Sequence, residues 1–95
     1  MPDPTPPVPQ PTSRPYALVV TSMDPLVPWS AVISTSGGFG EKFTKDMVSI
    51  RFPGTGGAKK GAEAIKARWP GCKIELREDV YVNGPNPEQI VIERY

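Results

Sequence analysis

Apolar residues recur along the chain in short runs that predict strands. Residues 16–22 (YALVVTS) contain a continuous apolar run, and residues 47–52 (MVSIRF) alternate between apolar and polar positions. Both patterns are typical of β-strands. Residues 31–35 (AVIST) predict a further short strand between these two.

One segment has the periodicity of a helix instead. Its apolar residues follow the spacing i, i+4, i+7 and i+11, at Ala58, Ala62, Ile65 and Trp69. This spacing places them on one face of a helix. Pro70 and Gly71 then provide a strong stop signal. We expect this helix to pack on the sheet, with its lysines in solvent.

The C-terminal part predicts a hairpin. Residues 72–82 alternate between apolar and polar positions and begin with Cys72. The alternation predicts that the Cys72 side chain faces the core. Residues 83–87 (NGPNP) have the chemistry of a turn, and residues 88–95 (EQIVIERY) form the last predicted strand. The register of this hairpin is expected to rest on four apolar residues, Val80, Val82, Ile90 and Ile92.

The predicted order is therefore β-β-β-α-β-β, in one α+β domain over residues 16–95. The fold class is a small antiparallel or mixed sheet of about five strands, with one helix packed on a face. Residues 23–29 contain Pro25 and Pro28 and predict a loop, and residues 36–46 predict a Gly-rich, charged connection.

An extended arm precedes this domain. Residues 1–15 (MPDPTPPVPQPTSRP) hold seven of the 13 prolines. Proline fixes φ, removes hydrogen-bond donors and holds its predecessor extended, so the arm is expected to be polyproline-II-like and semi-rigid. Because a pre-extended chain loses little entropy on ordering, such an arm is suited to lying along a neighbouring molecule.

Composition removes several classes of function. The chain has no histidine and one cysteine, so we predict no catalytic residues, no metal site and no cofactor. The net charge of +1 argues against bulk attraction to nucleic acid or membrane. No apolar run reaches the length of a membrane span, and no secretory signal is recognisable. A cytoplasmic or virion-associated protein is expected.

A Gly-rich stretch leads into the predicted helix, over residues 54–61. Glycines at a helix N-terminus let an anion approach free N–H groups. The Walker pattern fails, because Gly61 is followed by Ala62 and Glu63. Two interpretations stay open, a flexible connection and an anion contact. The anion contact would use Gly54, Thr55, Gly56, Gly57, Lys59 and Lys60.

The segment Gly38-Phe39-Gly40 resembles the centre of the RNA-recognition-motif signature. Three of seven positions match, and we expect a loop where that family has a strand, so the chain is not assigned to it. Aromatics on a Gly-rich loop are suited to anchoring a partner. The candidate partner contacts are Phe39, Phe43, Trp29, Lys42 and Lys45.

Three functions remain. The first and preferred one is a non-enzymatic interaction or structural protein that docks on a protein partner, a larger assembly or other copies of itself. A phage virion accessory protein or a phage inhibitor of a host factor fits this plan. The second is a nucleic-acid-binding module that uses segment 41–77, which holds nine basic and four acidic residues. The third is an anion- or nucleotide-binding sponge that uses loop 54–61.

Overall fold

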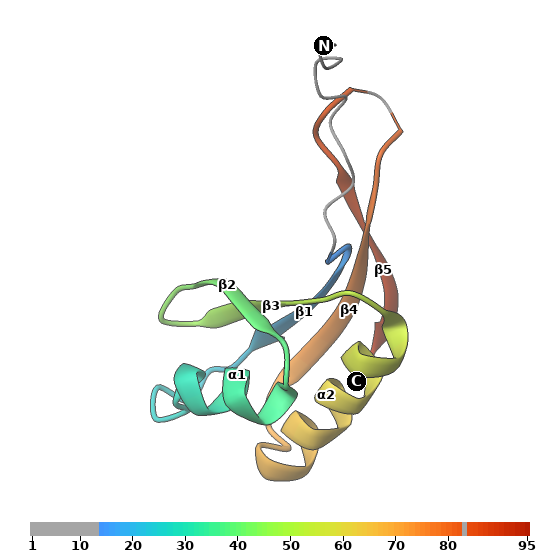
Figure 1. Ribbon diagram of the computed structural model, residues 1–95. Helices are drawn as coiled ribbons and strands as arrows, with labels where there is room; N and C mark the ends of the chain where they lie inside the picture. The colour runs from blue at the N-terminus through green and yellow to red at the C-terminus, as the bar shows by residue number, and fades with distance from the viewer. Residues whose placement is uncertain (1–13, 83) are drawn as a thin grey trace, which may run out of the picture.

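The computed structural model describes residues 14–82 and 84–95. Within these residues the chain forms a five-stranded antiparallel sheet and two helices (Figure 1). In chain order the elements are β1 (Tyr16–Thr21), α1 (Trp29–Ser36), β2 (Phe39–Phe43), β3 (Met47–Phe52), α2 (Thr55–Arg68), β4 (Lys73–Val80) and β5 (Glu88–Arg94). The prediction of an α+β fold with about five strands is confirmed. The predicted arm lies outside the described residues, except for residues 14 and 15.

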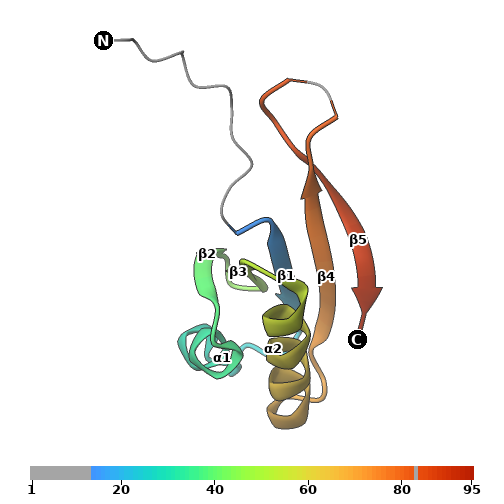
Figure 2. The ribbon, with the colours of Figure 1, turned by 45° about the vertical axis from the view of Figure 1, so that its right-hand side comes forward.

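Strand β1 occupies the centre of the sheet, whose order is β2-β3-β1-β4-β5. Each helix connects two strands that are separated by a third: β3 lies between β1 and β2, and β1 lies between β3 and β4. This is the split β-α-β, or ferredoxin-like, topology, with β5 added beside β4. Both helices cover the same face of the sheet (Figure 2). We call the opposite face the open face.

The core lies between the helices and the sheet. Leu18 of β1 stands opposite Ile50 of β3 on one side and Leu76 of β4 on the other, and all three are fully buried. Cys72 is buried as predicted, and so are the first three residues of the predicted helical stripe, Ala58, Ala62 and Ile65. The fourth, Trp69, is partly buried and packs against the same cluster.

The predicted strand at residues 31–35 is wrong, because this segment belongs to helix α1. Val32 and Ser36 are both buried, four residues apart, as one face of a helix requires. Gly37 ends the helix with a φ of 76°, and its N–H donates to the Ser34 carbonyl. A left-handed residue of this kind is a common helix terminator.

The connection predicted over residues 36–46 is also wrong in part, because it contains strand β2. This strand pairs with β3 at the edge of the sheet and has a register shift between Gly40 and Lys42. Four of its five residues are exposed, which explains why its composition is that of a loop.

The Gly-rich stretch predicted as a loop over residues 54–61 is mostly helical. Helix α2 begins at Thr55, so the connection from β3 consists only of Pro53 and Gly54. This short connection is possible because α2 starts directly beside the end of β3.

The C-terminal hairpin is confirmed, but its predicted register is wrong. Val80 stands opposite Glu88, and Ile90 stands opposite Glu78. Val82 lies outside both strands, and Ile90 and Ile92 are exposed. The pairing of strand backbones therefore does not follow the apolar residues here. Asn83 of the predicted turn is outside the described residues.

Helix α2 approaches the sheet and α1 closely at Gly61. A Cβ atom added there would lie 2.8 Å from the Ser36 carbonyl oxygen and 2.9 Å from Cζ of Phe52. Backbone cannot yield as a flexible side chain can, so this contact requires glycine. In contrast, a Cβ at Gly56 in the first turn of the same helix would meet nothing within 4 Å.

We therefore expect opposite effects from two Gly→Ala substitutions in one helix. Gly61→Ala should lower the free energy of unfolding by about 1–3 kcal/mol through overpacking. Gly56→Ala should leave it unchanged or raise it by up to about 1 kcal/mol, because alanine favours the helix. Urea unfolding followed by circular dichroism measures both. Equal effects of the two substitutions would contradict the packing described.

Candidate functional site

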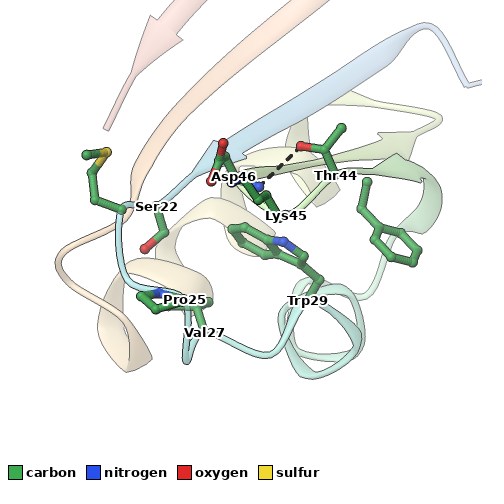
Figure 3. Close-up of a pocket in the computed structure, with 9 residues that line it drawn as sticks. Ser22, Pro25, Val27, Trp29, Thr44, Lys45 and Asp46 are labelled. Carbon is green, nitrogen blue, oxygen red and sulfur yellow. Dashed lines mark hydrogen bonds between the residues drawn. The ribbon is translucent and has the colours of Figure 1, made fainter.

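A cleft lies at the end of the sheet where β1 finishes, between the β1–α1 loop and the β2–β3 turn (Figure 3). Its volume is about 700 Å³. We call it the Trp29 cleft. Its lining comes from both connections, from the last residue of β2 and from the first residue of α1: Ser22, Met23, Pro25, Val27, Trp29, Phe43, Thr44, Lys45 and Asp46.

Local hydrogen bonds fix the loop that forms one wall of the cleft. The backbone N–H of Asp24 donates to Ser22 Oγ at 3.0 Å, and that of Leu26 donates to Asp24 Oδ1 at 2.9 Å. Such side-chain bonds to nearby backbone are the usual means of fixing a turn. The N–H of Ser22 also donates to the Asp46 carbonyl at 3.1 Å, which ties this wall to the opposite one.

Five of the nine residues that line the cleft are apolar, and four are polar. Trp29 is partly buried and packs on the core, and its ring lies between the two walls in Figure 3. Met23 is 99% exposed and Phe43 is 66% exposed. Lys45 makes no ion pair among the described residues. Large apolar side chains left in water around an aromatic floor are typical of an interaction site.

The structure brings together three of the five predicted partner contacts. Trp29, Phe43 and Lys45 line the same cleft. Phe39 and Lys42 do not, because they line hollows on the open face. The Phe39 ring there lies 4.8 Å from the guanidinium carbon of Arg14.

Sequence reasoning missed the other wall of the cleft, Met23, Pro25 and Val27. A signal was present: residues 23–29 (MDPLVPW) hold four large apolar side chains in a segment whose two prolines predict a loop. A loop rich in apolar residues has to bury them or expose them to a partner.

The open face carries a connected set of polar side chains, which we call the ionic lattice. It contains three carboxylates, three guanidiniums, one amide and one hydroxyl. Hydrogen bonds link them in the order Ser49, Glu41, Arg51, Asp79, Gln89, Arg77, Glu75 and Arg94. The lattice reaches from β2 to β5, and its six charges cancel.

The shortest links of the lattice are between charged groups. Arg51 Nη1 lies 2.8 Å from Asp79 Oδ2, and the Asp79 side chain is only 3% exposed. Arg77 Nη2 lies 2.6 Å from Glu75 Oε1. Glu75 is also bonded by Arg94, and these hydrogen bonds, first that of Arg77 and then that of Arg94, hold the pKa of the Glu75 carboxyl below its usual value.

The basic residues of segment 41–77 do not form one surface. Arg51 and Arg77 are neutralised within the lattice on the open face. Lys59 of α2 pairs with Glu93 at 3.7 Å, and Lys66 donates to the Cys72 carbonyl at 2.6 Å on the helical side. Lys45 is at the Trp29 cleft.

The predicted anion contacts lie at the start of α2. Gly54 is the N-cap residue and provides no side-chain cap, and Thr55, Gly56 and Gly57 form the first turn. The first turn contains no acidic residue. Of the two lysines, Lys59 is engaged by Glu93.

Residues 14–82 and 84–95 contain no group of three His, Cys, Asp or Glu side chains placed to hold a metal ion. In the same part of the chain, neither helix combines the length and the apolar character needed to cross a membrane. Comparisons of the chain with models of protein families, with curated proteins and with solved structures gave no match.

The lowered pKa of Glu75 makes part of the stability depend on pH. A carboxyl whose folded pKa is depressed contributes stability above its unfolded pKa, near 4.5, and that contribution is lost as pH falls through the folded pKa. The free energy of unfolding should therefore fall between about pH 5 and pH 3. Glu75→Gln should flatten this part of the profile. Glu88→Gln, at an exposed carboxyl without an ion pair among the described residues, is the control; equal profiles for the two variants would contradict the assignment.

Proposed function

We propose that this protein is a non-enzymatic interaction protein that docks on a protein partner through the Trp29 cleft. The observation that carries the proposal is the composition of the cleft. A partly buried indole forms its floor, and Met23 and Phe43 stand in water at its walls. Leu26, 84% exposed in the same loop, extends the apolar surface beyond the cleft.

The chemistry of the cleft suits an extended, proline-containing segment of the partner. Polyproline-II segments bind aromatic-lined grooves, because their rings are apolar and their backbone is already extended. Trp29 and Phe43 offer two aromatic surfaces, and Pro25 and Val27 add apolar contact. The exposed Lys45 at the rim can bond a carbonyl of such a segment, since proline leaves carbonyls free and supplies no N–H.

The two other functions have less support in the described residues. A nucleic-acid interface needs gathered, unpaired cations. Here the lattice neutralises Arg51 and Arg77, and the remaining cations are distributed over β2, the β2–β3 turn, α2 and β4. An anion site at the start of α2 would rest on helix N–H groups and on Lys60, since Lys59 pairs with Glu93.

The test is a titration of the isotope-labelled full chain with a decaproline peptide, followed by NMR. We expect the resonances of Trp29, Phe43 and Lys45 to shift. Phe43→Ala should weaken binding at least about fivefold, because it removes one aromatic wall.

Phe39→Ala is the matched control, because Phe39 is an exposed phenylalanine of the same strand but lines a hollow on the open face. It should leave the affinity unchanged. Absence of shifts at millimolar peptide, or shifts confined to the open face, would overturn the proposal.

A further inference from the structure

We infer that the segment which occupies the Trp29 cleft is the proline-rich arm of a second copy of this chain. This inference rests on the proposed function, because it names the partner of that site. It connects the cleft with residues 1–13, because this part of the sequence has the proline-rich composition that the cleft is proposed to bind.

The arm has the chemistry that the cleft selects. Residues 1–13 hold six prolines, and two overlapping Pro-x-x-Pro repeats run from Pro4 to Pro7 and from Pro6 to Pro9. This spacing places apolar rings at regular intervals on a polyproline-II helix, as groove recognition requires. Asp3 is the only charged side chain before Arg14, and the cleft offers it a partner of opposite sign in Lys45, next to Asp46 of the same sign.

The arm is also long enough to reach a neighbour. Thirteen residues in the polyproline-II conformation span about 40 Å, at about 3.1 Å each. A docked stretch of six or seven residues uses about 20 Å of this length. The remainder, about 20 Å, can bridge the distance between two domains.

The arm joins the domain at Arg14 and Pro15, which we call the arm root, and this point lies far from the cleft of the same copy. Asp79 N–H donates to the Pro15 carbonyl at 2.8 Å, so the chain enters as an extension of β1 alongside β4. Strand β1 then runs six residues, about 20 Å, before it reaches Ser22 at the cleft. Because Pro15 precedes β1 and Ser22 follows it, the start of the domain and the cleft lie at opposite ends of this strand, whose course is seen in Figure 1.

Docking in its own cleft would require the arm to reverse and run back beside β1. The covered face is occupied by the helices, and the open face by the ionic lattice, whose carboxylates and guanidiniums already satisfy one another. Pro11 and Pro15 fix their own φ and hold Gln10 and Arg14 extended, which leaves only Thr12 and Ser13 to make such a reversal next to the domain. Exchange between two copies avoids it, and the two arms then reinforce each other in a closed pair.

The experiment uses two full-length variants. The arm variant carries Pro4→Ser, Pro6→Ser, Pro7→Ser and Pro9→Ser, and the cleft variant carries Met23→Ala and Phe43→Ala at exposed side chains. Sedimentation velocity should show that the unaltered chain is a dimer that dissociates on dilution. Each variant alone should require at least tenfold higher concentration to associate.

A mixture of the two variants provides the decisive measurement. It restores one productive contact, between the arm of the cleft variant and the cleft of the arm variant. We expect a mixed dimer, detected with a fluorescent label on one variant, with an affinity between those of the unaltered chain and the separate variants. Val82→Ala, at an exposed apolar side chain between β4 and β5 and outside the cleft, is the control and should leave dimerisation intact.

Three outcomes would overturn the inference. In the first, the unaltered chain stays monomeric while Pro→Ser changes in its arm shift the Trp29 resonances, which would mean that the arm binds its own cleft. In the second, a dimer forms that neither variant weakens. In the third, the decaproline peptide binds the cleft but the chain does not associate, which would leave the proposed function standing and reject only this partner. Failure of the peptide to bind would instead reject the proposed function.

Discussion

The central strand β1 is the element on which the rest of the fold depends. It is six residues long, it is paired on both sides, and it joins the half of the sheet that holds β2 and β3 to the half that holds β4 and β5. Leu18 and Val20 are buried under the helices, and Ala17 and Val19 are buried on the open face. Both helices of the described residues lie on the other face. Here Arg51 and Arg77 flank Ala17, and Glu75 flanks Val19, so the long side chains of the ionic lattice shield these two residues from water.

The ionic lattice and the Trp29 cleft are therefore two surfaces of opposite character. The lattice closes the open face with charges that satisfy one another, and removal of one member leaves a partner such as the nearly buried Asp79 without compensation. In the cleft, by contrast, the apolar side chains of Met23 and Phe43 are exposed to water. An apolar surface of this kind gains free energy when a partner covers it, whereas a satisfied ionic surface gains little.

How far the sequence predicts this structure depends on how much of each element is buried. Helix α2 and strands β1 and β3 have strong apolar patterns and were predicted. Helix α1 was not, because its valine, isoleucine and threonine favour a strand by composition, and only the flanking Pro28 and Gly37 mark its ends. Strand β2 was missed because Gly40 was interpreted as a loop residue, although it leaves room for Ile33 of α1. The aromatic residues Trp29 and Phe43 indicated one part of the Trp29 cleft from the sequence. The wall formed by the β1–α1 loop could not be predicted, because it depends on a loop conformation and no periodicity in the sequence encodes one.

Register shifts occur in the pairing of both outer strands, at Gly40–Lys42 in β2 and opposite Leu76–Arg77 in β5. A shift of this kind disrupts the regular row of N–H and C=O groups that an edge strand offers to another sheet. Both borders of the sheet are thereby poor templates for strand addition, which is the route by which small open sheets polymerise and precipitate. Association of copies of this chain by strand addition at either border is therefore disfavoured.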